Sequence, residues 1–114
     1  MARQNPGEPY WRVSLEEANN MIGKGDAVVI DVRDPNEWAA GHVAGAMHIP
    51  VDDILSRVDE LPPDKDLLFI CAMGVRSGLA CEMAAAMDIS SDRLYNIEDG
   101  TNAWITSNYP TERA

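Results

Sequence analysis

One seven-residue stretch of the chain combines a nucleophilic side chain, a permanent positive charge and a flexible backbone. Residues 71–77 have the sequence Cys-Ala-Met-Gly-Val-Arg-Ser. The nucleophilic form of cysteine is the thiolate, and a free cysteine with a pKa near ~8.5 is mostly protonated at neutral pH. Backbone N–H groups from Ala72 to Arg76 can surround the sulfur, and Gly74 permits the positive φ of a tight curl. Together with the Arg76 charge, these groups favour a thiolate that needs no histidine base.

The segments on either side predict that this stretch is a turn from a strand into a helix. The apolar run at residues 67–70 is typical of a buried strand, and the alanine-rich segment at residues 78–87 is typical of a helix that begins near Ser77. The positive end of that helix would point at the turn and favour an anion there. The sequence therefore predicts a site for an anion or a sulfur anion, with an inert buried cysteine at a strand end as the alternative.

Strand and helix patterns alternate along the chain, which predicts an α/β fold with a parallel sheet and helices on both faces. Strands are expected at residues 10–13, 27–32, 47–49, 67–70 and 94–97. Helices are expected at residues 14–22, 35–40, 51–61, 78–87 and 101–107, the first two after capping boxes that pair Ser14 with Glu17 and Asp34 with Glu37. The helix at residues 78–87 is predicted to bury one face, made of Leu79, Ala80, Met83, Ala84 and Met87. Cys71 and Asp31 both end strands, so we expect both at the edge of the sheet where ligands bind.

The composition is that of one ordinary globular domain of 114 residues, with 46% hydrophobic and 25% charged residues. We expect a flexible N-terminal arm at residues 1–9 and a single domain at residues 10–114. The net charge of -10 argues against nucleic acid and against anionic membrane surfaces as partners. No apolar run approaches the ~20 residues that span a bilayer, and the first nine residues lack the apolar core of a secretory signal. We therefore expect a cytoplasmic protein.

Three segments of the chain, in order, resemble the signatures of the rhodanese-like family. Residues 71–77 resemble the active-site loop of that family. Residues 31–33, 37–38, 41–46 and 49–50 resemble its N-terminal signature. Residues 100–104, followed by the Tyr-Pro pair at 109–110, resemble its C-terminal signature. The resemblance spans residues 13–110, which is nearly the whole chain.

This resemblance implies a rhodanese-like fold, with a five-stranded, mainly parallel sheet flanked by helices on both faces. It also implies sulfurtransferase chemistry. Cys71 would take sulfane sulfur from thiosulfate, from polysulfide or from a protein persulfide, hold it as a persulfide, and pass it to a thiol or to cyanide. Arg76 would hold the oxyanion of the donor together with the substrate-binding loop residues Ala72, Met73, Gly74, Val75 and Ser77. The resemblance calls for no cofactor, and the Cys and His residues show no metal-binding spacing.

Two other functions stay open on the sequence. One is a non-catalytic interaction module on the same fold, which the intact Cys71 and Arg76 disfavour. The other is a phosphatase or an arsenate reductase. Related enzymes of that kind use a loop one residue longer, because phosphate or arsenate needs a wider cradle than a single sulfur. Four residues separate Cys71 from Arg76 here, and this length fits sulfur.

Several polar residues outside the loop are expected to have structural duties. The resemblance implies that Asp31 and Arg33 brace the sheet edge and that Glu37 and His42 hold the neighbouring helix and turn. Cys81 is predicted to be a small packing residue, not a resolving thiol for Cys71.

The C-terminal signature differs from the family pattern at one position. Asp99 precedes Gly100 where the family often has paired glycines. Asp tolerates left-handed backbone geometry better than most residues, so we expect the fold to survive. A carboxylate near the sheet edge would disfavour a doubly charged donor, which leaves room for a polysulfide or a protein persulfide.

Overall fold

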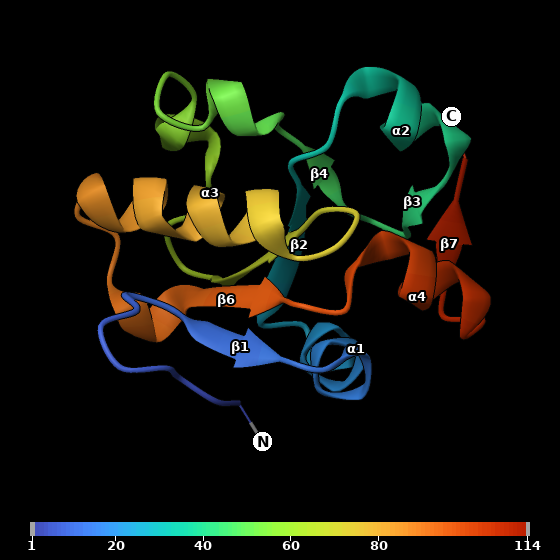
Figure 1. The fold of residues 1–114 in the computed structure, drawn as a ribbon, viewed down its shortest axis with the longest axis horizontal. Coiled ribbons are helices and arrows are strands. Elements are labelled where there is room, and N and C mark those ends of the chain that lie inside the picture. The colour runs from blue at the N-terminus through green and yellow to red at the C-terminus, as the bar shows by residue number, and fades with distance from the viewer. Residues whose placement is uncertain (1, 114) are drawn as a thin grey trace.

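The computed structural model describes residues 2–113 and contains a five-stranded sheet in the order β1-β6-β5-β2-β4 (Figure 1). All four neighbouring pairs are parallel. The strands are β1 (Trp11–Val13), β2 (Ala27–Asp31), β4 (Met47–His48), β5 (Asp66–Ile70) and β6 (Leu94–Ile97). A second, antiparallel pair joins β3 (His42–Val43) to β7 (Thr111–Glu112). The predicted α/β fold with a five-stranded parallel sheet is confirmed, and β5, which leads into the cysteine loop, is its central strand.

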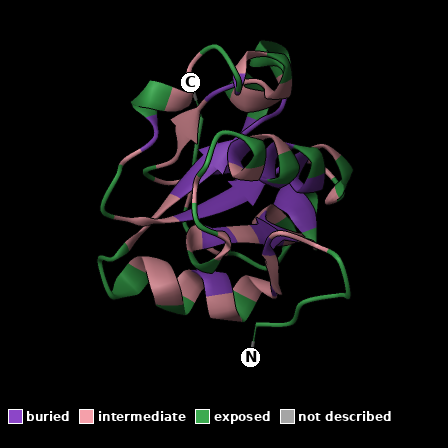
Figure 2. Ribbon diagram, turned by 90° about the vertical axis from the view of Figure 1, so that its left-hand side faces the viewer, coloured by how far each residue is buried: buried purple, intermediate pink, exposed green. Residues whose placement is uncertain are grey.

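Helices cover both faces of this sheet. They are α1 (Leu15–Gly23), α2 (Pro35–Ala40), α3 (Val75–Ala86) and α4 (Gly100–Thr106). The contacts of β5 explain why its residues do not alternate between apolar and polar. Leu67 and Phe69 pack in one core cluster with α3, and Leu68 and Ile70 pack in a second cluster with α1 and α4. All four residues are fully buried. Figure 2 shows the strands in the middle of the molecule coloured mostly as buried. A strand covered on both faces favours apolar residues on both, and residues 67–70 of β5 are all apolar.

Both predicted capping boxes form. The Ser14 hydroxyl accepts a hydrogen bond from the Glu17 backbone N–H at 3.2 Å, and the Glu17 carboxylate accepts one from the Ser14 N–H at 2.8 Å. At α2 the Glu37 carboxylate accepts from the Asp34 backbone N–H at 3.1 Å, and Pro35 occupies the first turn. These boxes satisfy N–H groups that the first helical turn leaves free, so the two helices begin where the sequence predicts.

The predicted helix at residues 51–61 was wrong. The structure has two single-turn 3-10 helices there, η1 (Val51–Asp53) and η2 (Val58–Glu60). Ile54 is 1% exposed and belongs to the core cluster on the α3 side of the sheet. The apolar spacing therefore reflects burial against α3. The β-branched residues and the aspartates of this segment have low helix propensity, so the spacing does not produce an α-helix.

The start and the buried face of α3 also differ from the prediction. The helix begins at Val75, inside the loop, because Gly74 takes a left-handed conformation and serves as the N-cap. Its buried face is formed by small residues, Ser77, Gly78, Ala80, Cys81 and Ala84. Leu79 and Met87, predicted to be buried, are 46% and 44% exposed. Small side chains let α3 lie close to the sheet, and the bulky ones point outward.

The N-terminal segment lies partly along the sheet. Arg3 forms an isolated antiparallel bridge with Arg12 of β1. The flexibility expected of residues 1–9 stays a prediction, as does the single-domain boundary at residue 10. No helix within residues 2–113 combines the length and the apolar character that crossing a membrane requires.

Candidate active site

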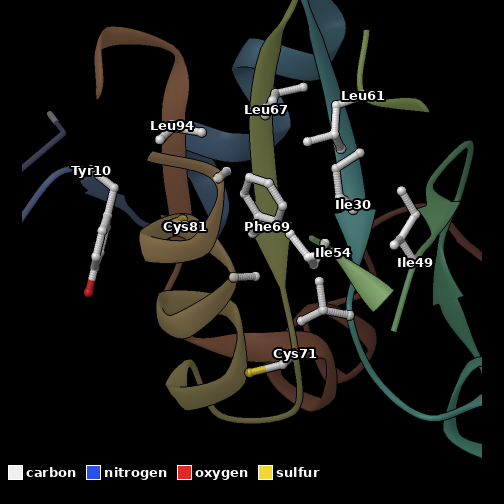
Figure 3. Close-up of a cluster of buried hydrophobic side chains, with 13 residues drawn as sticks. Tyr10, Ile30, Ile49, Ile54, Leu61, Leu67, Phe69, Cys71, Cys81 and Leu94 are labelled. Atoms are coloured by element: carbon white, nitrogen blue, oxygen red, sulfur yellow. The ribbon is translucent and has the colours of Figure 1, made fainter. Parts of the chain in front are cut away.

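The Cys71 sulfur lies directly after the central strand, beside the first turn of α3 (Figure 3). Its side chain is 1% exposed. The backbone N–H of Gly74 points back at the sulfur, with 3.1 Å between N and Sγ. The Ser77 hydroxyl lies 3.3 Å from the same sulfur. The positive φ of Gly74, 90°, makes this curl possible. The loop therefore encloses the sulfur with hydrogen-bond donors, as the sequence predicts.

Two opposing effects act on the Cys71 thiol. Burial raises the pKa of Cys71. Hydrogen bonds from the Ser77 side chain and from the backbone N–H groups of Ser77, Met73 and Gly74 lower this pKa by more than burial raises it. The pKa therefore lies below its ordinary value, and the thiolate is favoured.

Two glycines let the loop lie against the turn that precedes α4. A Cβ atom on Gly100 would lie 1.9 Å from the Ala72 carbonyl oxygen, and a Cβ on Gly74 would lie 2.7 Å from the Glu98 carbonyl oxygen. Next to this contact, the Thr101 N–H and hydroxyl donate to the Cys71 carbonyl oxygen at 2.9 and 3.2 Å. Backbone approaches this close exclude any side chain, so both glycines are needed to position the start of the loop.

The expectation that Asp99 has to adopt a left-handed backbone conformation was wrong. Asp99 has an ordinary right-handed conformation, with φ of -73°, and only Gly100 carries the positive φ, 83°. The backbone at position 99 therefore has a conformation that any residue can adopt. Its side chain is exposed and lines the opening beside the loop.

Arg76 is held by Glu37, which comes from α2. The two guanidinium Nη atoms donate to the two carboxylate oxygens of Glu37 at 2.7 and 3.0 Å. This hydrogen-bonded pair lowers the pKa of Glu37 to about 2, against the opposing effect of partial burial. It also raises the pKa of Arg76. Much of the positive charge predicted for the anion site is therefore shared with a carboxylate.

Sequence reasoning missed this pair. It assigned Glu37 to the start of its own helix, and Glu37 does accept the Asp34 N–H there. One signal in the sequence was available. The short α2 follows β2, and the loop follows β5, so both lie beyond the same edge of the sheet. An acidic residue in the first turn of α2 then lies within reach of a basic residue in the loop.

A second missed residue is Asn96 on β6, which is 1% exposed. Its side-chain oxygen accepts a hydrogen bond from the Ser77 hydroxyl at 2.6 Å, and its side-chain nitrogen donates to the Gly74 carbonyl at 3.1 Å. The available signal was an amide side chain within a strand that is otherwise apolar or aromatic. Such a group must find partners when it is buried.

The other candidate polar residues form bracing contacts. Buried Asp31 and Arg33 form an ion pair at 2.7 Å, and Arg33 also donates to the Gly41 carbonyl at 2.7 Å. His42 stacks on Trp38, with ring centroids 3.4 Å apart, and its Nδ1 lies 2.8 Å from the Trp38 carbonyl oxygen. These contacts fit the structural duties expected of Asp31, Arg33 and His42.

Cys71 and Cys81 are both free cysteines. Cys81 lies further along α3, is 0% exposed and belongs to the core cluster (Figure 3). Burial raises its pKa well above the ordinary value, and Glu82 and Glu8 raise it further. The prediction that Cys81 is a small packing residue is confirmed.

A hollow of about 660 Å³ opens beside the loop. Met73 and Val75, two of the predicted substrate-binding residues, line it and are each 80% exposed. Its polar lining consists of Tyr10, Arg12, Glu82, Glu98 and Asp99. Arg12 donates to Glu8 at 2.6 Å and to Glu98 at 3.3 Å, so its charge is already shared. The opening is thus apolar at the loop and acidic at its side.

Comparison with known proteins shows which family this chain belongs to. The family model described as the rhodanese-like domain matches residues 14–107. The thiosulfate sulfurtransferase GlpE of Pseudomonas entomophila is 34% identical over 105 residues, covering 92% of this chain and 93% of that protein. An uncharacterized Bacillus subtilis protein, YqhL, is 34% identical over 91 residues, covering 80% of this chain and 71% of that protein.

Solved structures agree with this placement. A rhodanese-related protein from Thermoplasma volcanium has a TM-score of 0.80 and 27% identity, covering 90% of this chain and 98% of that one. The human single-domain sulfurtransferase TSTD1 has a TM-score of 0.72 and 28% identity, covering 90% of this chain and 99% of that one. The chain therefore belongs to the rhodanese-like family.

Proposed function

We propose that this protein is a sulfurtransferase in which Cys71 carries the transferred sulfur as a persulfide. The observation that carries the proposal is the Cys71 sulfur enclosed by a loop whose Gly74 N–H lies 3.1 Å from it. The relatives named as thiosulfate sulfurtransferases support the same activity. A lowered pKa supplies the thiolate that such chemistry needs, with no partner histidine required.

The reaction has two displacement steps. The Cys71 thiolate attacks the outer, sulfane sulfur of the donor. A bond forms between the two sulfurs, and the donor's own bond to that sulfur breaks, so that thiosulfate would leave as sulfite. A thiolate or cyanide then attacks the outer sulfur of the persulfide. The bond to Cys71 breaks, its electron pair returns to the Cys71 sulfur, and the product is a new persulfide or thiocyanate. No external oxidant or reductant is needed.

The loop would assist the steps in which the Cys71 sulfur carries a negative charge. The N–H donors around Cys71 stabilise its thiolate both as the attacking group and as the leaving group. The loop amides at residues 72–77 and Arg76 would bind the donor anion. Because Arg76 shares its charge with Glu37, we expect weak saturation by a dianion such as thiosulfate and stronger saturation by a protein persulfide, whose transferred sulfur carries one negative charge.

The short loop also supports sulfur over phosphate or arsenate as the transferred group. Four residues separate Cys71 from Arg76, and Gly74 N lies within hydrogen-bond distance of the cysteine sulfur itself. A cradle this close around one sulfur atom matches a persulfide. The free thiol chemistry also fits the reducing cytoplasm, which is the location we propose.

The decisive experiment is the intact mass of the protein after incubation with thiosulfate, polysulfide or a persulfidated protein. We expect a gain of one sulfur atom, about 32 Da, which cyanide or a thiol then removes. Cys71→Ser should take up no sulfur, and the matched variant Cys81→Ser should take it up like the native chain. A failure of every donor to load the native protein would favour the non-catalytic interaction module. Loading that persists in Cys71→Ser would refute the role of Cys71.

A further inference from the structure

Behind the Cys71 sulfur lies a short chain of buried hydrogen bonds. The sulfur is 3.3 Å from the Ser77 hydroxyl oxygen, which donates to the Asn96 side-chain oxygen at 2.6 Å. The Asn96 side-chain nitrogen donates to the Gly74 carbonyl at 3.1 Å. The Cys71, Ser77 and Asn96 side chains are at most 1% exposed. The chain thus connects the reactive sulfur to β6, which lies beside β5 in the sheet.

The orientation of the Asn96 amide follows from its neighbours. The Gly74 carbonyl can only accept a hydrogen bond, so the NH₂ group of Asn96 must face it. The amide oxygen must then face Ser77. That oxygen can only accept, so the hydroxyl has to supply the proton of the 2.6 Å bond.

A serine hydroxyl has a single proton, and this fixes its relation to Cys71. While the proton points at Asn96, the Ser77 oxygen can only accept a hydrogen bond from an S–H group. This arrangement gives the S–H group of the neutral thiol a hydrogen-bond acceptor. When Cys71 is a thiolate, the hydroxyl has to turn toward the sulfur, and the buried amide oxygen of Asn96 loses its donor.

The persulfide resembles the thiol in this respect. Its negative charge is on the outer sulfur, and the inner Cys71 sulfur is uncharged and a weak acceptor. The Ser77 proton can then return to Asn96. The charged and titratable groups around the loop are the Arg76–Glu37 pair, the Asp31–Arg33 pair and the groups that line the hollow, Tyr10, Arg12, Glu82, Glu98 and Asp99. The chain of hydrogen bonds itself consists of Cys71 and neutral groups, so its state changes only with the charge of the sulfur.

We propose that Asn96 is a positioning residue that competes with the Cys71 sulfur for the single Ser77 hydroxyl proton, and thereby favours the uncharged sulfur of the thiol and of the persulfide over the thiolate. A less stabilised thiolate is also a stronger nucleophile toward the donor. The statement about the persulfide, the persulfide half of this inference, rests on the proposed function. The statement about the thiol and the thiolate, the thiol half, does not, because it concerns the protein before any sulfur is transferred.

The thiol half is tested by the pH dependence of Cys71 alkylation with iodoacetamide, followed on the Cys71 peptide by mass spectrometry. Asn96→Leu keeps a similar side-chain size and releases the hydroxyl proton to the sulfur. We expect the midpoint to fall by about one pH unit, which is a tenfold gain in thiolate below the midpoint. Ser77→Ala in the native background should raise the midpoint less than the same substitution does in Asn96→Leu, because the native hydroxyl can turn to the thiolate only by leaving Asn96. Adding Ser77→Ala to Asn96→Leu should abolish the fall and give the midpoint of Ser77→Ala alone.

Two results would overturn the proposal. One is a midpoint in Asn96→Leu that is unchanged or higher. The other is a rise on Ser77→Ala that is as large in the native background as in Asn96→Leu, since this would mean that Asn96 does not compete for the hydroxyl proton. Where Asn96→Leu does not fold, Asn96→Ala gives the same comparison.

A matched control separates this effect from a loosened loop. Thr101→Val removes a different side-chain hydrogen bond to the loop, from the Thr101 hydroxyl to the Cys71 carbonyl at 3.2 Å, and leaves Ser77 and Asn96 untouched. We expect lower thermal stability with an unchanged alkylation midpoint. A shift equal to that of Asn96→Leu would show that loop loosening explains the result and would overturn the proposal.

The persulfide half is tested by the loaded fraction at a fixed ratio of donor to released product, measured by intact mass above the midpoint. With a donor that loads the native protein, Asn96→Leu should lower the ratio of loaded to unloaded protein about tenfold, as its thiolate is stabilised and its persulfide is not. An unchanged ratio would overturn this half. The alkylation results stand apart from it, because they need no sulfur transfer.

Discussion

Cys71 and Cys81 are ten residues apart and belong to the same core cluster, yet their thiols differ in pKa in opposite directions. Exposure does not separate them, because their side chains are 1% and 0% exposed. Burial raises the pKa of both. Only at Cys71 do hydrogen bonds from the loop and Ser77 outweigh it. The difference in pKa between these two buried cysteines is therefore set by the donors around each sulfur.

The position of each cysteine relative to α3 explains where the donors come from. Cys71 precedes the helix, and the N–H groups of its first turn have no carbonyl partner within the helix. They are free to bind a sulfur anion. Cys81 lies in the middle of α3, where each N–H already bonds to the carbonyl four residues earlier. A thiolate at Cys81 would be buried without donors.

The largest effect we expect is selective alkylation. Iodoacetamide should modify Cys71 of the folded protein at least about a hundredfold faster than Cys81, because only Cys71 combines a lowered pKa with a place at the loop. Peptide mass spectrometry over time would give both rates. In urea the two rates should converge, since the loop and the core are both lost. Equal rates in the folded protein would break the comparison.

Gly100→Ala should have the next largest effect, because a Cβ at this position would lie 1.9 Å from the Ala72 carbonyl oxygen and would push the loop away from α4. We expect a loss of stability on the order of 3 kcal/mol or more, together with slower Cys71 alkylation. Urea unfolding and the alkylation assay would measure the two.

A matched glycine isolates the cause of the Gly100 effect. Gly25 also has a φ of 83°, but a Cβ there would have no atom within 4 Å. Gly25→Ala should therefore cost only the backbone strain, about 1 kcal/mol, and leave Cys71 alkylation unchanged. Equal losses from the two variants would show that strain, and not contact with the loop, is what Gly100 avoids.

Features encoded by neighbouring residues could be predicted from the sequence. The strand at residues 67–70, the capping boxes of α1 and α2, and the loop that starts at Cys71 all depend on residues a few positions apart. The family signatures supplied the fold because they occur in order along most of the chain. Local pattern was therefore sufficient for the strands of the sheet, for the starts of α1 and α2 and for the loop that holds Cys71.

Features that depend on how distant segments meet could not be predicted. The Arg76–Glu37 pair joins α3 to α2, and the Ser77–Asn96 bond joins α3 to β6. No regular sequence spacing, such as that of a helix or of a capping box, predicts either contact. The exposure of Leu79 has the same origin, since it depends on how closely α3 approaches the sheet. The loop around the proposed nucleophile, Cys71, could thus be predicted from the sequence, and its distant partners Glu37 and Asn96 could not.

The smallest effects concern the charge near Cys71. Arg76 interacts electrostatically with Cys71, and Glu37 shares its charge. Glu37→Gln keeps the side-chain shape and leaves the Arg76 charge unshared. We expect the Cys71 alkylation midpoint to fall by a few tenths of a pH unit, about 0.3, and Arg76→Gln to raise it by a similar amount. Cys81 should not respond to either variant. A shift of the same sign in both would contradict the charge argument.

The same pair makes a prediction about stability and pH. The folded-state pKa of Glu37, about 2, lies below its ordinary value of 4.5. The pair therefore stabilises the fold fully above about pH 4.5, and this contribution is lost as the pH falls toward 2. Because both side chains are about a third exposed, at 33% and 31%, we expect it to stay below about 1 kcal/mol. Urea unfolding of the native chain and of Glu37→Gln should differ by a constant amount at neutral pH and converge in acid. A difference that grows as the pH falls would mean that Glu37 is not held ionised by Arg76, and that the Arg76 charge is available in full to Cys71 and its substrates.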